Sequence, residues 1–423
     1  MNTLFSKLAL IIRDTAIRKR ILFTLGALVV FRVLAAIPIP GVDTTRLAAF
    51  LSNNQFFGLL NIFSGGGLST LSIIMLGVGP YITGSIIMQL LTIMSPRLKA
   101  MYQEEGEIGR RKFAQFSRML TVPLAIIQGY SFLALLQNQG AIGALSTTEQ
   151  VINVAIITAG SLLIMWIGEL ISEFGIGNGV SIIIFAGIVA RLPVVISQFF
   201  FTFETAQLPI YLGVLAVALL VIAGVVVITE AERPIPITYA KRVRGMKVYG
   251  GVSTYLPLRL NQAGVIPIIF ALSILLFPQM IFQFIANVNV AVLKTISDFV
   301  LGALANGWVY AIFYFVLVFI FTYFYTAVTF DPNMISENLQ KSGAFIPGVR
   351  PGQSTSEYVA RILTRLTLVG ASFLGLIAVL PLVMKAVTGI TSFAIGGTAL
   401  LIVVSVVIDL IKKVDAQVSI REY

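Results

Sequence analysis

Residues 73–94 read IIMLGVGPYITGSIIMQLLTIM, a stretch that is long and apolar on every side. A helix crosses the roughly 30 Å core of a bilayer with about 20 apolar residues, whereas a barrel strand needs about ten residues of alternating polarity. The stretch therefore predicts a membrane-spanning helix. Comparable stretches elsewhere bring the prediction to ten spans: 21–37, 71–94, 119–136, 151–171, 180–203, 208–228, 263–285, 308–328, 366–384 and 390–408.

The composition of the whole chain supports this prediction. Hydrophobic residues make up 57% of the 423 residues and charged residues 11%, against about 25% charged in an ordinary globular domain. The chain contains no His and no Cys. Their absence excludes Ser-His-Asp triads, thiolate nucleophiles, haem attachment and the usual structural zinc sites. We therefore expect no metal, no cofactor and no enzymatic activity.

The basic residues are placed asymmetrically along the chain. Most of the 29 Lys and Arg residues fall at the two ends and in the loops after spans two, six and eight. The positive-inside rule then puts both termini and these loops in the cytoplasm. This arrangement explains the net charge of +11 without nucleic acid, so no DNA partner is expected.

The spans divide into two groups of five at a short external turn. An odd number of spans in each half means that related halves are inverted, which places a functional site near the membrane midplane. The expected organisation is a cytoplasmic amphipathic segment over 1–20, a first half over 21–204, a second half over 205–411 and a cytoplasmic tail over 412–423. The second half carries two long cytoplasmic loops, 230–262 and 329–365, whose Tyr, Ile, Val and Pro content favours order.

Two glycine-rich segments interrupt the apolar pattern. NIFSGGGLSTLS (61–72) is either a flexible external loop or a short mobile segment packed back into the membrane, which is allowed only inside protein or along a cavity. Its last residues continue into LSTLSIIML (68–76), which we expect to be helical. ISEFGIGNGVSIII (171–184) predicts a tight turn at the inner surface, not a nucleotide loop, because no strand precedes it.

Charged residues inside the predicted spans are few. Glu169, Asp409 and Arg32 each lie near a span end, where charged side chains reach the interface. A ten-span secondary transporter for a small solute would need midplane charges, and a membrane-bound enzyme would need a pair of buried acids. The two basic, aromatic-containing loops could dock on anionic lipid, an acidic protein or RNA, and composition does not choose among them.

Motifs spread over nearly the whole chain resemble the bacterial SecY family, the pore subunit family of the protein-conducting channel. The resemblance rests on seven segments: RVLAAIPIPGVD (32–43), NIFSGGGLSTLSI with GPYITGSIIMQLL (61–91), EGEIGRRKFAQFSR (105–118), GELISEFGIGNGVSIIIFAGIVA (168–190), YAKRVRG (239–245), LPLRLNQAGVIPIIFA (256–271) and ENLQKSGAFIPGVRPG (337–352).

The resemblance implies an all-α polytopic membrane protein, with ten transmembrane helices in two inverted five-helix halves around a central pore. It implies a closing ring of aliphatic side chains at Val78, Ile82, Ile184, Ile269 and Ile402. It also implies a plug on the external side, made of Asn61, Ile62, Phe63, Ser64, Gly65, Gly66, Gly67, Leu68, Ser69, Thr70, Leu71 and Ser72. Val78 departs from the bulkier Ile frequent in the family, and Arg191 from uncharged residues in many relatives.

The resemblance further implies a lateral gate toward lipid between the second and seventh spans, with polar candidates at Gln89, Thr121 and Ser273. Arg242 and Arg350 match docking residues for the motor ATPase SecA and the ribosome. The family function is to conduct unfolded, signal-bearing preproteins outward and to release hydrophobic segments into the lipid bilayer. The implied partners are SecE, SecG, SecA, the ribosome and YidC, and the implied location is the inner (plasma) membrane.

Overall fold

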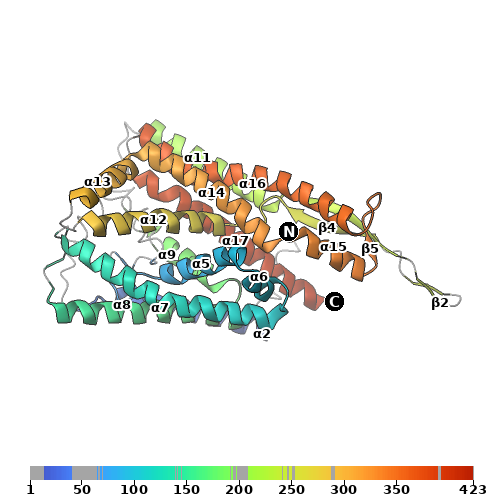
Figure 1. The fold of residues 1–423 in the computed structure, drawn as a ribbon, viewed down its shortest axis with the longest axis horizontal. Helices are drawn as coiled ribbons and strands as arrows, with labels where there is room; N and C mark the ends of the chain where they lie inside the picture. Colours follow the sequence, from blue (N-terminus) through green and yellow to red (C-terminus); the bar gives the residue numbers. More distant parts are fainter. Residues whose placement is uncertain are drawn as a thin grey trace.

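The computed structural model is a predominantly helical bundle with a β-hairpin and a short helix projecting from one end (Figure 1). The structure describes residues 14–40, 64, 67–68, 70–138, 140, 142–143, 145–190, 192–193, 197, 208–240, 242–244, 247–249, 253–286, 291–388 and 392–422. Arg191, Asn61–Phe63, Gly65, Gly66 and Ser69, all named in the sequence predictions, lie outside these ranges.

The helices of the structure are mostly long and apolar. In the first part of the chain they are α2 (Thr15–Ala36), α5 (Gly79–Met94), α6 (Pro96–Gln103), α7 (Gly106–Asn138), α8 (Thr147–Phe174) and α9 (Gly179–Val189). In the second part they are α11 (Leu208–Glu230), α12 (Ile266–Ala286), α13 (Ala291–Ala305), α14 (Gly307–Thr329), α15 (Pro332–Lys341), α16 (Gln353–Thr388) and α17 (Ser392–Glu422).

Several of these helices could span a membrane. Among the described residues, five helices are long and apolar enough to cross a bilayer, namely α7, α8, α11, α14 and α16, and the helices α5, α9 and part of α12 are apolar but shorter. Many large apolar side chains of α2, α7, α11 and α14 are exposed on the outside of the bundle. Such a surface is stable in lipid and would aggregate in water.

The second span differs from the prediction. Residues 71–78 form successive turns instead of the start of a helix, and α5 begins at Gly79. Leu71 and Gly77 have positive φ angles of 44° and 54°, which a right-handed helix does not tolerate. Pro80 lies at the start of α5, where its missing N–H is not needed. The helix expected over 68–76 was therefore wrong for its described residues.

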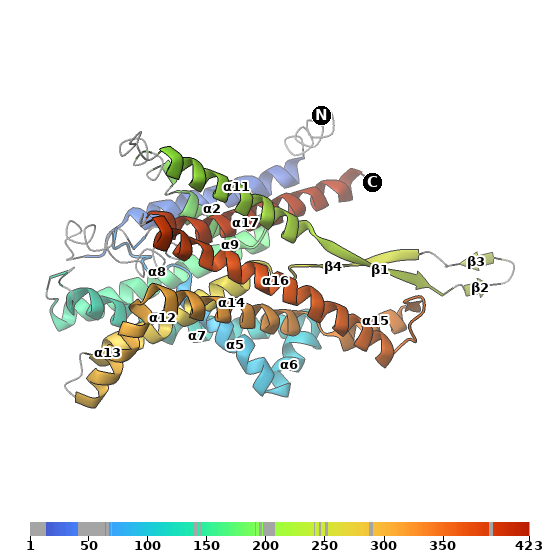
Figure 2. The ribbon, with the colours of Figure 1, turned by 90° about the horizontal axis from the view of Figure 1, so that it is seen from above.

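Three helices and a small sheet were missing from the list of spans. The helices α6, α13 and α15 are short or carry charges, which places them below the length and polarity of a span. The strands β1 (Glu232–Tyr239), β4 (Ser253–Arg259) and β5 (Ala344–Phe345) pair antiparallel in the order β4-β1-β5. Strands β2 (Arg242–Arg244) and β3 (Lys247–Tyr249) pair at the hairpin tip (Figure 2).

The order predicted for the two long loops is confirmed in their described residues. Both loops contribute to one small apolar core at the base of the hairpin, outside the apolar bundle. This core contains Ile235, Leu258, Ile346, Val359, Ile362 and Leu363. We call this unit, made of β1, β4, β5, α15 and the first turns of α16, the protrusion.

Candidate functional site

The five residues predicted for the closing ring are all buried members of one large apolar cluster. Val78 is the N-cap of α5 and Ile82 lies one turn later, whereas the other three belong to α9, α12 and α17. These helices occupy the middle of the bundle (Figure 1). All five side chains are at most 7% exposed and belong to one apolar cluster: Val78, Ile82, Ile184, Ile269 and Ile402.

Glycines and one serine bring the surrounding helices close enough to build this centre. Gly168 of α8 and Gly179 of α9 touch so closely that a Cβ on Gly179 would overlap the carbonyl of Gly168. Small residues of this kind allow close helix packing in membranes. Ser161 Oγ donates to the carbonyl of Gly77 at 2.9 Å. This bond holds the turn before Val78 against α8.

The described residues of the predicted plug pack beside the centre. Leu68 and Leu71 belong to a second apolar cluster, and Ile73 packs against both clusters. The main chain is pinned to the end of α2, because Ile39 N–H donates to Leu71 O at 2.8 Å and Ile73 N–H donates to Ile37 O at 3.0 Å. The segment is thus tied to its surroundings mainly by main-chain bonds.

Two hydroxyl groups of the same segment behave differently. Thr70 Oγ1 donates to the carbonyl of Ala35 in the last turn of α2 at 2.8 Å. Ser72 is buried, and its Oγ has no hydrogen-bond partner among the described residues. A buried hydroxyl without a partner is unfavourable, so this position is held by its neighbours and not by its own side chain.

The three residues predicted for a lateral gate lie on helices that contact one another. Gln89 is on α5, Thr121 on α7 and Ser273 on α12, and α12 packs against both of the others. Their hydrogen bonds, however, stay within their own helices: Gln89 to Ser85, Thr121 to Ser117 and Ser273 to Ile269. Among the described residues, no hydrogen bond joins two of the three.

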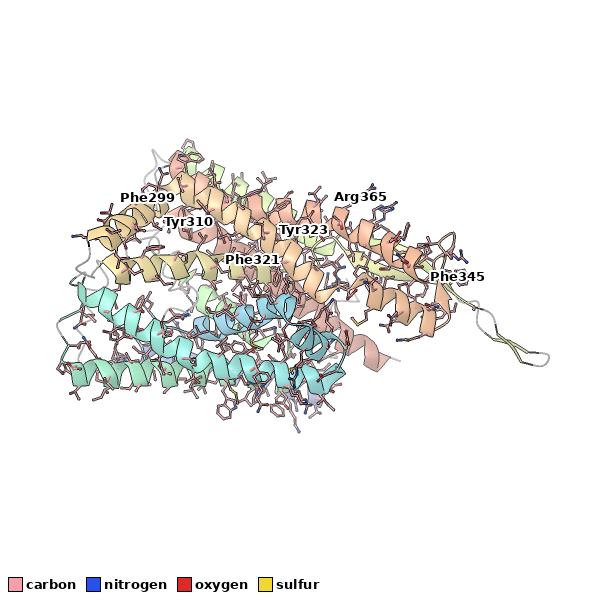
Figure 3. The ribbon with its side chains drawn as sticks, viewed as in Figure 1. Phe299, Tyr310, Phe321, Tyr323, Phe345 and Arg365 are labelled. Atoms are coloured by element: carbon pink, nitrogen blue, oxygen red, sulfur yellow. The ribbon has the colours of Figure 1, made fainter. Side chains whose placement is uncertain are left out.

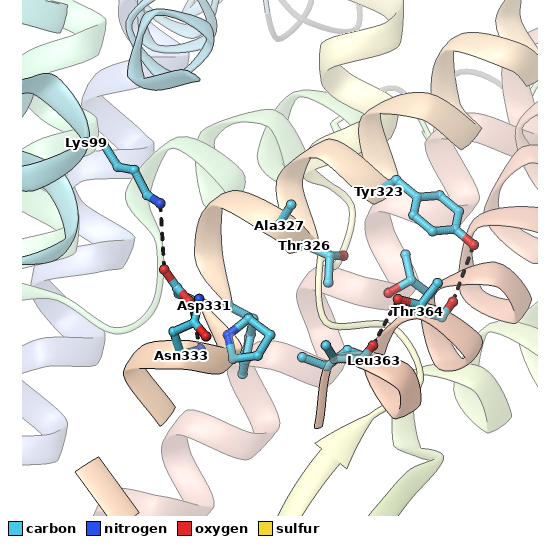
Figure 4. Close-up of a pocket in the computed structure, with 12 residues that line it drawn as sticks. Lys99, Tyr323, Thr326, Ala327, Asp331, Asn333, Leu363 and Thr364 are labelled. Atoms are coloured by element: carbon cyan, nitrogen blue, oxygen red, sulfur yellow. Dashed lines mark hydrogen bonds and ion pairs between the residues drawn. The ribbon is translucent and has the colours of Figure 1, made fainter. Parts of the chain in front are cut away.

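Polar contacts between the first and second parts of the chain do occur at α6, a helix that the sequence analysis did not predict. Gln103 Nε2 donates to the carbonyl of Val328 in the last turn of α14 at 2.8 Å. Lys99 Nζ lies 3.7 Å from Asp331 Oδ2, and Asp331 also caps α15 by accepting from Asn333 N–H at 2.9 Å. A cavity of about 310 Å³ adjoins Lys99 and Asp331 and extends between α14 and α16 (Figure 4). No sequence pattern predicts the Lys99–Asp331 contact, because the two residues are brought together only by the fold.

The predicted docking residues lie at the projecting end of the molecule, Arg350 in the protrusion and Arg242 at the hairpin tip beyond it (Figure 1). Arg350 is exposed, and its guanidinium makes no hydrogen bond or ion pair with the described residues. Arg242 begins β2 at the hairpin tip. Phe345, at the end of β5, and Arg365, further along α16, also lie on this part of the molecule (Figure 3). The protrusion therefore presents the exposed Arg350 side chain beyond the end of the bundle (Figure 1).

Acidic residues in the helices are engaged in ion pairs. Glu169 on α8 pairs with Arg118 on α7, and Asp409 pairs with Lys413 one turn later on α17. Within the described ranges, no group of three or more acidic residues could hold a metal ion. The pairs support the interpretation of Glu169 and Asp409 as helix-end charges.

The fold has counterparts among solved structures. It is similar to "The structure of a protein conducting channel", with a TM-score of 0.65 and 18% identity over 96% of this chain and 93% of that one. Sec61 in the canine ribosome-channel complex from the endoplasmic reticulum matches with a TM-score of 0.64, 18% identity and the same coverage. The chain therefore shares the fold of a class of helical, multi-pass membrane proteins that includes these two channels.

Sequence comparisons assign the chain within that class. The SecY family model matches residues 72–411. Protein translocase subunit SecY of Mycobacterium tuberculosis is 41% identical over 97% of both chains. Its counterpart in Streptomyces lividans is 42% identical over 96% of both chains. The chain belongs to the SecY family.

Proposed function

We propose that the chain is the central channel subunit of a Sec translocase. It conducts unfolded, signal-bearing polypeptides across the membrane and releases hydrophobic segments sideways into lipid. The observation that supports this proposal is that the five aliphatic side chains, from four helices, belong to one buried apolar cluster in the bundle. Uncharged branched side chains seal around a chain of any sequence, and a hydrophobic constriction also closes by dewetting.

The position of the segment at 64–72 supports a plug next to this ring. Leu68 and Leu71 lie in an apolar cluster that meets the central cluster at Ile73. The described residues of this segment form turns and hydrogen bonds, with no helix among them. The segment is therefore suited to leave its place when a polypeptide enters. The lateral gate is then the α5–α12 contact that contains Gln89 and Ser273, with Thr121 on the adjacent α7.

The basic protrusion supports docking of the partner that supplies energy. In this proposal Arg350 and Arg242 bind the motor ATPase SecA or the ribosome, SecE and SecG associate with the helices in the membrane, and YidC receives released segments. The chain lies in the inner membrane with both termini in the cytoplasm. A solute transporter is less well supported, because Glu169 and Asp409 are paired near helix ends and not at a midplane site.

Ion conductance through the resting protein tests the proposed ring. Replacing Ile82, Ile184 and Ile402 together with Ser removes the aliphatic seal, so small-ion conductance in planar bilayers should rise at least severalfold. The matched control replaces Ile86, Ile164 and Ile377, which lie in the same cluster with similar burial. Unchanged conductance in the ring variant, or equal conductance in both variants, would remove these residues from the seal.

A further inference from the structure

Two buried hydroxyl groups form hydrogen bonds with the main chain of the loop that carries Arg350. Thr355 Oγ1 donates to the carbonyl of Arg350 itself at 2.9 Å. Ser336 Oγ donates to the carbonyl of Gly352 at 2.7 Å. Thr355 is 2% exposed and Ser336 3%. These bonds act on the backbone on either side of Pro351, so they fix the direction from which the Arg350 side chain leaves the loop.

The two hydroxyl groups come from different helices that are themselves joined. Ser336 lies on α15 and Thr355 in the first turn of α16. Ser356, next to Thr355, donates to Asn333 Oδ1 on α15 at 2.6 Å. The loop between α15 and α16 is thus closed across its base by three side-chain hydrogen bonds.

The other end of the loop is anchored by apolar packing. Ile346 is buried in the small core of the protrusion, and Val349 N–H donates to the Ile346 carbonyl at 3.0 Å. Gly348 and Gly352 have φ angles of 81° and 96°, which glycine adopts without a steric penalty. Between these fixed points the Arg350 side chain is exposed and forms no hydrogen bond or ion pair with any described residue.

This arrangement differs from that of an ordinary exposed Arg. A free surface Arg loses rotamer and backbone freedom when it binds, whereas a fixed backbone reduces that loss. Its planar guanidinium also needs a defined approach to form two parallel hydrogen bonds with a carboxylate or phosphate. A rigid loop that displays one unpaired Arg has both properties.

We propose that Ser336, Thr355 and Ser356 are positioning residues, which hold the Arg350 loop in the geometry needed to bind an anionic group on the energy-supplying partner. This inference rests on the docking role proposed above for Arg350. The affinity of the Arg350 loop for the partner then depends on buried hydroxyl groups that do not themselves touch the partner. Their loss weakens docking without changing the maximal rate once the partner is bound.

The test uses the full chain with SecE and SecG in proteoliposomes, with purified SecA as the probe. The double variant Ser336→Ala with Thr355→Val should raise the SecA concentration for half-maximal translocation ATPase about tenfold, because two hydrogen bonds are lost. The maximal rate should stay the same. Thr355→Ser retains the hydroxyl and should behave as the unaltered protein. Ser342→Ala, which removes a bond between Ser342 and Leu339 in the same protrusion, is the matched control.

A mutant cycle separates positioning from general stability. In an Arg350→Ala background, the Ser336 and Thr355 changes should have no further effect on half-saturation, because they act through Arg350. An additive effect, or a normal half-saturation in the double variant while Arg350→Ala is impaired, would overturn the inference and leave the docking role standing. Normal half-saturation in Arg350→Ala itself would instead overturn the docking role.

Discussion

Gln103 and Val328 are 225 residues apart in the chain, yet the Gln103 side-chain amide donates to the Val328 carbonyl at 2.8 Å. This carbonyl would ordinarily accept from the N–H four residues later, but that residue is Pro332, which has no N–H. Gln103 supplies the missing donor from α6. Together with the Lys99–Asp331 pair, it connects the segment after α5 to the corner between α14 and α15.

Removal of this connection should favour opening of the proposed gate. An unsatisfied buried carbonyl costs about 1 to 3 kcal/mol, so Gln103→Ala destabilises any state in which Val328 stays covered. The chain has no Cys, so cysteines introduced at Gln89 and Ser273 are the only pair that can cross-link. We expect a slower rate of disulfide formation between them in the Gln103→Ala variant.

The control for this experiment is Gln150→Ala. Gln150 donates to Gln137 at 2.8 Å between α8 and α7, and neither helix end belongs to the α6–α14 connection. An equal slowing in both variants would indicate general loosening. An unchanged rate in Gln103→Ala would show that the connection does not restrain α5 and α12.

Thr70 should control how readily the plug leaves its place. Thr70→Val keeps the shape of the side chain but removes the hydrogen bond to Ala35. A bond of this kind contributes about 0.5 to 1.5 kcal/mol, which corresponds to roughly a two- to tenfold shift between closed and open states. Single-channel recordings should therefore show more frequent openings. The control is Thr83→Val, which removes a bond within α5 and should leave the opening frequency unchanged. Equal opening frequencies in the two variants would contradict the prediction.

Arg350→Glu should impair driven transport and leave folding intact. The side chain is exposed and unpaired among the described residues, so its replacement breaks no hydrogen bond or ion pair with them. The reversed charge, however, repels an anionic docking group. We expect normal expression and SecE association, with SecA-driven translocation reduced at least tenfold. Arg361→Glu, also exposed on α16, should transport normally. If Arg350→Glu transported at the normal rate, Arg350 would be only a solvated surface charge without a docking role.

Ile235→Ala should destabilise the protrusion alone. Ile235 is buried with Leu258 and Ile346 in a core outside the apolar bundle, where water makes apolar burial favourable. Loss of a buried Ile costs about 2 to 5 kcal/mol. Limited proteolysis should then cut the protrusion faster while the helices resist. Tyr255→Ala on the exposed face of β4 is the control, and equal protease resistance in both variants would show that this core contributes little.

The apolar helices were accessible from the sequence because they depend on local apolar length, whereas the assignment of the ring residues came from family motifs and stays a prediction. The start of α5 could have been placed correctly, since the run Gly77-Val78-Gly79-Pro80 is a strong signal for a turn before a helix. The Gln103–Val328 bond and the support of Arg350 by Ser336 could not be predicted. Each joins segments that are brought together only by tertiary packing, and single Gln or Ser residues have many other roles.

The position of β1 at the centre of its sheet has a mechanical consequence. Because β1 pairs with β4 on one edge and with β5 on the other, the two long loops after α11 and α14 are joined in one sheet and move as one unit. A force applied at the hairpin tip is transmitted through β1 to β5 and onward to the loop that carries Arg350. A molecule bound at the hairpin tip and one bound at the Arg350 loop would therefore act on the same strand, β1. Binding of the first would change the orientation of the surface that the second one contacts.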